Sequence, residues 1–160
     1  MTARSDGFTL IELVIVILLL GILAAFAVPK WLGKGGFETH TLRDELVTRL
    51  RLVQTINMQE GPARCTQLVV ESGRFGHLTQ LGNCTPKAIS GWDQNEQARG
   101  RVVKASGSIS LPQGSFSFDK RSGRPVSPSA CISGCNLMVS DGGESARLRI
   151  EPEGYIHAIP

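Results

Sequence analysis

The sequence predicts an α+β fold in which a long N-terminal helix packs on an antiparallel β-sheet. Three observations support this class. Residues 8–28 form one apolar run, a helical stripe of apolar residues follows it, and the second half of the chain alternates short strand patterns with turn signals. The chain has 160 residues and a formal net charge of +3. It is long enough for one modest core, and its mildly basic charge does not by itself indicate a nucleic-acid partner.

The apolar run from Phe8 to Val28 has the length of a membrane-spanning helix. As a helix it would extend over roughly 32 Å, about the thickness of the hydrocarbon core of a bilayer. Glu12 is the one residue of the run that can carry a charge, and a carboxylate in that setting needs a partner. A secretory signal peptide, with a shorter apolar stretch, remains an alternative because residues 24–27 (AAFA) imitate a cleavage site. A plain membrane anchor is another, but it leaves Glu12 unexplained.

The stretch GFTLIE, residues 7–12, follows a short leader with a positive charge at Arg4 and precedes the apolar run. This combination resembles the class III signal of type IV pilins and type II secretion pseudopilins. The resemblance implies that a prepilin peptidase cleaves between Gly7 and Phe8 on the cytoplasmic side and methylates the new amino terminus of Phe8. Residues 1–7 would be a removed leader, and residues 8–28 would stay as a transmembrane and assembly helix.

The same resemblance gives Glu12 a role in assembly. In that family the glutamate of one subunit pairs with the N-terminal amine of its neighbour, and an ion pair is strong where the dielectric constant is low. The implied partners are other pilin subunits, contacted through the N-terminal helix, the prepilin peptidase and the inner-membrane assembly platform. The implied location is a single pass through the inner membrane with the head in the periplasm, and the cell surface once the subunit is in a pilus.

Residues 29–59 are expected to form an amphipathic half of the helix with a glycine-rich break. Pro29 favours a kink, or an end of the first helix at Val28, because proline removes a helical hydrogen bond. The stretch GKGG at 33–36 is poor in helix formers, and residues 41–44 (TLRD) resemble a capping box that could restart a helix.

A helical stripe then predicts a helix that packs on the sheet and closes at Gly61-Pro62. Glu45 and Arg49 are spaced for an ion pair along this helix. The stripe comprises Leu42, Leu46, Leu50, Val53 and the nearby Ile56, and the opposite face carries Arg43, Asp44, Arg49 and Arg51.

Residues 60–160 are expected to form a globular, β-rich head. In the segment 146–151 three apolar residues alternate with Arg147 and Arg149, which predicts one buried and one basic face. Short turn signals at 141–143 and 152–154 favour antiparallel hairpins, and residues 87–99 are expected to be a surface loop. The predicted strands are Gln67–Glu71, Arg101–Ala105, Ser108–Leu111, Ser115–Asp119, Asn136–Ser140, Ala146–Glu151 and Tyr155–Ala158.

Four cysteines, Cys65, Cys84, Cys131 and Cys135, suit an oxidising compartment and two disulfides. Three pairings are possible, and sequence order favours the local ones, Cys65–Cys84 and Cys131–Cys135. The spacing of the last two would also suit a metal, but no second tight pair exists and the three histidines are scattered. No metal and no cofactor are therefore expected.

The C-terminal segment from Phe116 onwards resembles minor pilins and pseudopilins of the FimT/GspH kind, and its ending EGYIHA resembles a minor pilin of the mannose-sensitive haemagglutinin (MSHA) pilus. The resemblance implies a pilin fold and a minor subunit that helps to initiate or display an adhesive type IV pilus. A minor pseudopilin of a type II secretion system is the first alternative, and a DNA-binding minor pilin of an uptake pilus is the second.

The DNA alternative depends on four arginines, Arg121, Arg124, Arg147 and Arg149, which could contact phosphates. Acidic residues close to them in the sequence argue against a nucleic-acid partner. No nucleotide-binding glycine motif and no nucleophile elbow are present. The sequence therefore predicts a structural subunit that is the substrate of an enzyme, without an enzymatic activity of its own.

Overall fold

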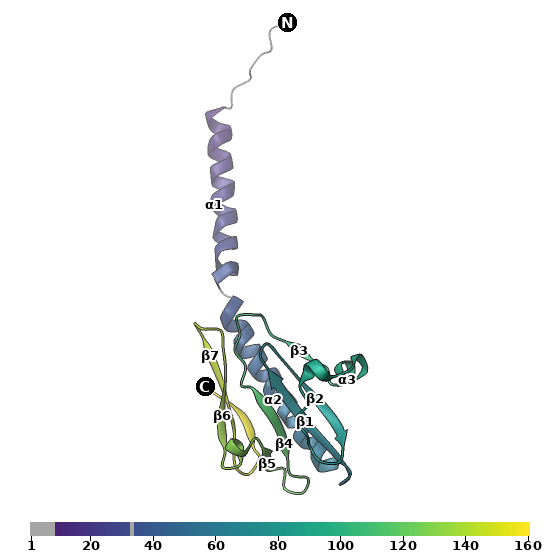
Figure 1. The fold of residues 1–160 in the computed structure, drawn as a ribbon. Coiled ribbons are helices and arrows are strands. Elements are labelled where there is room, and N and C mark those ends of the chain that lie inside the picture. Colours follow the sequence, from purple (N-terminus) through teal and green to yellow (C-terminus); the bar gives the residue numbers. More distant parts are fainter. Residues whose placement is uncertain (1–8, 33) are drawn as a thin grey trace. The chain divides into compact units, whose positions relative to one another are not determined.

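The computed structural model describes the backbone of residues 9–32 and 34–160 and the side chains of residues 9–24 and 37–160 (Figure 1). The chain divides between Lys34 and Gly35 into two compact units. The first contains helix α1 (Leu10–Leu32), and the second, which we call the head, contains nearly all of helix α2 (Lys34–Gln59) and every strand. The fold is α+β, as the sequence predicts.

Helix α1 extends through Pro29 to Leu32, so the alternative in which it ends at Val28 is wrong. The side chain of Pro29 lies outside the described residues, as does residue 33 between the two helices, so the predicted kink and break stay predictions. Gly35 and Gly36 are part of α2.

Thr41 does not restart a helix, contrary to the prediction, because α2 already begins at Lys34. Its hydroxyl donates a hydrogen bond to the carbonyl of Phe37, one turn back, at 2.8 Å. Ser and Thr hydroxyls commonly make this bond inside helices. The low helix propensity of the glycines is outweighed by the apolar stripe that the same helix buries.

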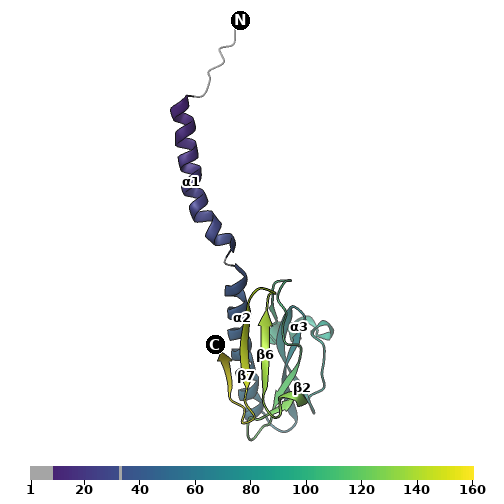
Figure 2. The same ribbon diagram turned by 90° about the vertical axis from the view of Figure 1, so that its left-hand side faces the viewer.

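The strands form two antiparallel sheets (Figures 1 and 2). One has five strands in the order β3-β2-β1-β4-β5, and the other has three in the order β6-β7-β8. An isolated bridge between Ser110 and Ser140 joins β6 to the segment before β4. The bounds are β1 Arg64–Glu71, β2 Arg74–Leu81, β3 Val103–Lys104, β4 Gly114–Phe118, β5 Pro125–Ser127, β6 Cys135–Ser140, β7 Ser145–Ile150 and β8 Ile156–Ile159.

Five predicted strands overlap β1, β4, β6, β7 and β8, and the other predictions need correction. The segment predicted at 101–105 keeps only two residues as β3, and 108–111 supplies a single bridge instead of a strand. Strands β2 and β5 were not predicted. In β2, two glycine-flanked aromatic residues, Phe75 and His77, replace the β-branched residues that mark a strand, and pairing with β1 decides its conformation.

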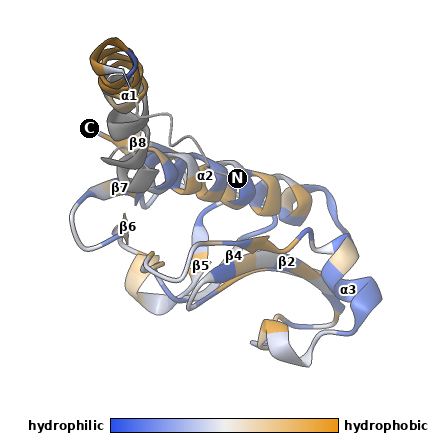
Figure 3. Cartoon of the chain, turned by 90° about the horizontal axis from the view of Figure 1, so that it is seen from above, coloured by the Kyte–Doolittle hydropathy of each residue, from blue (hydrophilic) through white to orange (hydrophobic). Residues whose placement is uncertain are grey.

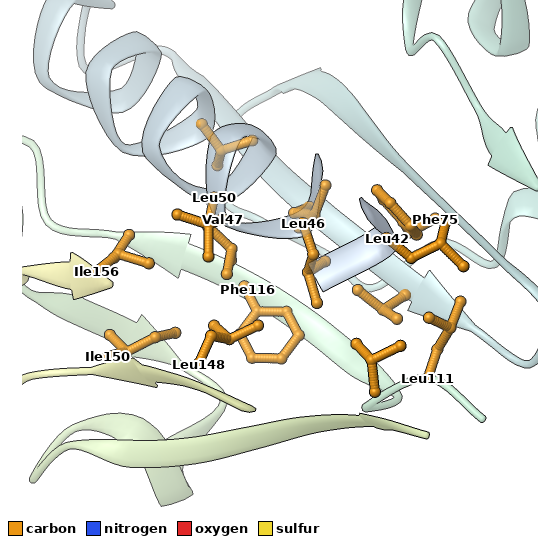
Figure 4. Packing of buried hydrophobic residues seen from close by; sticks show 14 of the residues in the cluster. Leu42, Leu46, Val47, Leu50, Phe75, Leu111, Phe116, Leu148, Ile150 and Ile156 are labelled. Carbon is orange, nitrogen blue, oxygen red and sulfur yellow. The ribbon is translucent and has the colours of Figure 1, made fainter. Parts of the chain in front are cut away.

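The main core lies between α2 and the strands (Figures 3 and 4). The predicted stripe is confirmed, because Leu42, Leu46, Leu50 and Val53 are all buried, and Ile56 is partly buried. Both sheets supply the opposing surface, and β7 buries its alternate apolar residues as predicted. The residues that oppose the helix include Phe75, Leu111, Phe116, Leu148, Ile150 and Ile156.

The segment predicted as the surface loop 87–99 is ordered and partly buried. It contains a short 3-10 helix, η1 (Ile89–Gly91), and helix α3 (Gln94–Arg99). Ile89 and Trp92 are buried against Val69 and Leu78, in a second apolar cluster. Helix α3 starts with a capping box, in which the Asp93 carboxylate accepts from the Glu96 amide at 2.7 Å and Glu96 accepts from the Asp93 amide at 3.0 Å.

Where β1 and β4 separate, the side chain of Asn57 makes the backbone hydrogen bonds that a neighbouring strand would make. The two strands pair only between Leu68–Val70 and Gly114–Phe116. Two residues earlier, the Asn57 amide donates to the Thr66 carbonyl at 2.8 Å and accepts from the Thr66 amide at 3.1 Å. Asn57 and Thr66 are fully buried, so these two bonds satisfy backbone groups that would otherwise be costly to bury.

Candidate functional site

Helix α1 begins with a cap that places Glu12 in its first turn. The Thr9 carbonyl accepts from the amides of Glu12 and Leu13 at 3.1 and 3.3 Å, and the Thr9 hydroxyl accepts from the Glu12 amide at 3.4 Å. The Glu12 side chain is exposed. A carboxylate in the first turn is favoured by the partial positive charge of a helix N-terminus.

From Leu13 to Ala24, the last residue of α1 whose side chain is described, the helix consists of apolar residues and Gly21; Figure 3 colours the helix by hydropathy. Exposed fractions run from 46% at Val16 to 82% at Leu10. A helix that is apolar on all sides is one that is buried in a larger assembly or in lipid. The exposed set is Leu10, Ile11, Leu13, Ile15, Val16, Ile17, Leu18, Leu19, Leu20, Ile22 and Leu23.

Glu12 has no ion-pair partner among the residues that the structure describes. If this helix is covered by apolar groups, its carboxylate loses its hydration and requires a cation from outside the described chain. Gly7 and Phe8, the predicted cleavage and methylation residues, lie outside the described residues. Within the described part, none of the helices meets the length and apolarity needed to cross a membrane.

Both predicted disulfides are present in the head. Cys65 is joined to Cys84, nineteen residues away, and Cys131 to Cys135, four residues away. The first holds the end of β2 against the start of β1, and the second closes the turn before β6. In the described residues, no group of three or more His, Cys, Asp or Glu side chains is arranged to hold a metal ion.

The structure does not bring the four candidate arginines together. Arg121 and Arg124 lie in the turn between β4 and β5, whereas Arg147 and Arg149 lie on β7 of the other sheet. Arg149 is already engaged, because its guanidinium donates to Glu151 at 2.8 Å and to Asn136 at 3.0 Å.

Arg121 instead shares a groove with two other cations, Arg64 and Lys120. The groove has a volume of about 490 Å³ and lies between the α2–β1 connection, the Cys65–Cys84 disulfide and the β4–β5 turn. This group could not be predicted from the sequence, because Arg64 is more than fifty residues away from the turn. No local pattern marks the approach of the two segments.

A second, more polar pocket of about 230 Å³ lies where α3 meets β2, lined by residues that include His77, Asp93 and Glu96. Burial lowers the pKa of His77, and the charges of Arg49 and Arg101 lower it further. Glu96 is held by Lys87 at 2.8 Å and by the cap of α3, and its bond to Lys87 lowers its pKa. Asp93 and Glu96 are thus engaged in the cap of α3, whereas the Nδ1 atom of His77 has no hydrogen-bond partner among the described residues.

Comparisons with known proteins point to the N-terminal segment. Residues 2–28 match the family described as "Prokaryotic N-terminal methylation motif". Over 52 residues the chain is 42% identical to the type IV major pilin protein PilA of Myxococcus xanthus (strain DK1622). This aligned segment is 32% of this chain and 22% of that protein. The chain thus matches about a fifth of the length of this relative. No solved structure matches the chain.

Proposed function

Since the N-terminal segment of this chain is that of the type IV pilin family, we propose that the protein is a minor pilin. It is cut between Gly7 and Phe8 by a prepilin peptidase, methylated at Phe8 and assembled into an adhesive, MSHA-like type IV pilus. The observation that carries the proposal is helix α1, which is apolar on every described side and has the lone carboxylate of Glu12 in its first turn.

The proposed partners follow from this helix. Residues 8–28 anchor the subunit in the inner membrane with the head in the periplasm, and pack against the helices of other subunits after extraction by the assembly platform. The amine of Phe8 on an incoming subunit then pairs with Glu12 of a subunit already in place. Such a pair is strong inside an apolar bundle, and a lone charge there is costly.

Intact mass of the membrane-extracted protein tests the processing step. We expect loss of residues 1–7 and a gain of one methyl group. A mature chain that began near Val28 would identify residues 1–27 as a secretory signal instead and would end the proposal.

The Glu12→Ala variant tests the assembly step. The variant should still be inserted and processed, because the change removes a charge from an apolar helix. Its incorporation into sheared filaments should fall by at least about tenfold, since an unpaired amine costs more than about 1.4 kcal/mol in such surroundings. The matched control is Thr9→Ala, which removes only the 3.4 Å cap bond and should assemble normally. Equal incorporation of the Glu12 variant and the wild type would reject the ion pair.

A minor pseudopilin of a type II secretion system is the second candidate, because the C-terminal segment has the same resemblance to the GspH kind. Gene order around the coding sequence separates the two candidates. The separation of the arginine pairs and the engagement of Arg149 by Glu151 argue against a DNA-binding head.

A further inference from the structure

The groove beside Arg121 carries a net positive charge at the end of the head where α2 finishes. Arg64 and Arg121 are exposed and form no ion pair within the described residues. Hydrogen bonds from Ser122 and Arg121 lower the pKa of Asp119, and the charge of Arg121 lowers it further. Lys120 donates to the carbonyls of Gly61 and Arg64, which fixes its ammonium group at the rim of the groove.

The one carboxylate that lines this groove is already occupied. The Asp119 Oδ1 atom accepts from the amides of Arg121 and Ser122 at 3.1 and 2.8 Å and from the Ser122 hydroxyl at 2.7 Å. Val126, Phe118 and the Cys65–Cys84 disulfide give the groove an apolar side. It therefore suits a narrow, negatively charged segment.

The turn between β6 and β7, residues 141–144 (DGGE), is such a segment, and we call it the acidic turn. The Asp141 carboxylate accepts from the amides of Gly143 and Glu144 at 3.0 and 2.8 Å, which keeps the turn compact. A side chain at Gly142 would meet no atom within 4 Å, so the turn projects into solvent. Glu144 is exposed and has no ion-pair partner in the described part of the chain.

The β4–β5 turn, which borders the groove, and the acidic turn between β6 and β7 lie at opposite ends of the head (Figure 1). At the groove end, Gln54 near the end of α2 donates to the carbonyls of Gly123 and Gly154. At the other end, Glu38 near the start of α2 accepts from the Ser106 amide. The Ser110–Ser140 bridge fixes the chain just before the acidic turn.

We propose that the acidic turn of one copy of this chain docks in the basic groove of the next. The contact joins two different surfaces of the same head, so it is heterologous and does not close into a dimer; repeated, it gives an open-ended row. The inference rests on the proposed function, because it names the head contact between successive subunits of the filament. The exposed Glu144 carboxylate would face the guanidinium groups of Arg64 and Arg121, because the Asp141 carboxylate already accepts from two amides of its own turn. Gly142 and Gly143 would leave room for backbone approach.

Directional cross-linking in membranes tests the contact with the full-length protein. Two copies with different epitope tags are co-expressed, one with Arg121→Cys and the other with Glu144→Cys, and mild oxidation is followed by a non-reducing gel. The control pairs Arg147→Cys, an exposed arginine of β7 outside the groove, with the same Glu144→Cys copy. We expect the mixed-tag dimer at several times the yield of the control pair.

Charge reversal supplies a readout that misfolding cannot imitate. Arg121→Glu alone should lower co-purification of the two tags about fivefold, the effect of losing an exposed charge pair, and adding Glu144→Arg should restore it. Mixed-tag yields equal to the control, or no restoration by the double change, would overturn the proposal.

Different results would reject the head contact and the pilin function. Normal Glu12-dependent filaments without the cross-link would overturn the head contact and leave the pilin proposal intact. The cross-link in membranes of cells that never place the protein in filaments would support the contact and reject the filament role.

Discussion

The pKa of His77 is lowered by burial and by Arg49 and Arg101, and no hydrogen-bond partner is present for its Nδ1 atom among the described residues. The folded head therefore holds this imidazole neutral at a pH where the unfolded chain would protonate it. As the pH falls below the unfolded pKa of about 6.5, the unfolded state binds the proton first, so the stability of the head decreases.

The His77→Gln variant should therefore have a flatter pH dependence of the free energy of unfolding between pH 7 and 5. The measurement is the free energy of unfolding by urea at both pH values, for the variant and the wild type. The carboxyl groups with lowered pKa values include Glu96 and Glu151. Their contribution to the free energy of unfolding is lost at lower pH, so it changes little between pH 7 and 5. An identical slope in both proteins would show that His77 is not the group responsible.

Single residues divide into those that the sequence could identify and those that it could not. The GFTLIE stretch is a motif of adjacent residues. Gly7, Phe8 and Glu12 could therefore be proposed as functional residues from the sequence alone. The cysteine pairs could be favoured because they are local. Asn57 and Arg64 could not be identified, because their roles depend on segments that meet only in the folded chain.

At the scale of elements, Gly100 follows helix α3 and packs against strand β2, where its carbonyl accepts from the His77 amide at 3.2 Å. A Cβ atom at this position would lie 2.5 Å from the His77 carbonyl oxygen and 2.7 Å from the Trp92 ring. The backbone of Gly100 is in the ordinary right-handed region, with φ −71°. The close approach to β2, and not the backbone conformation, therefore requires glycine.

Accordingly, Gly100→Ala should destabilise the head by about 1–3 kcal/mol, the usual range for an overpacked site. It should also increase hydrogen exchange in residues 87–100 selectively. Gly91→Ala is the matched control, because its nearest neighbour beyond the local chain is 4.0 Å away, and it should change stability by less than about 0.5 kcal/mol. If the two variants behaved alike, α3 would not depend on this approach.

Elements with a strong internal period were predictable, and those defined by a neighbour were not. The apolar stripe of α2 and the alternating apolar residues of β7 are visible within one short segment of the sequence each. The apolar residues of both patterns are buried, as predicted. Strand β2 and the 87–99 segment have weak patterns, and their structure comes from pairing with β1 and from the burial of Ile89 and Trp92. The Asp93–Glu96 capping box was a readable signal for α3.

At the scale of the whole molecule, the apolar core and both disulfides lie beyond Gly35. The exposed apolar residues of α1 lie before it. A fragment of residues 35–160 should therefore fold on its own and stay in solution, with a melting temperature within a few degrees of that of the full chain in detergent. Calorimetry and gel filtration measure this, and an aggregated or unfolded fragment would mean that α1 contributes to the stability of the head.

The amide of Asn57 has a consequence for how such subunits can join. Proteins rich in β-structure often associate by adding a strand of one chain to an open edge of another. At the point where β1 and β4 separate, Asn57 already occupies the hydrogen-bonding groups of Thr66, and Lys120 occupies the carbonyl of Arg64. A strand of another copy therefore finds no free backbone group of Thr66 to pair with at this position.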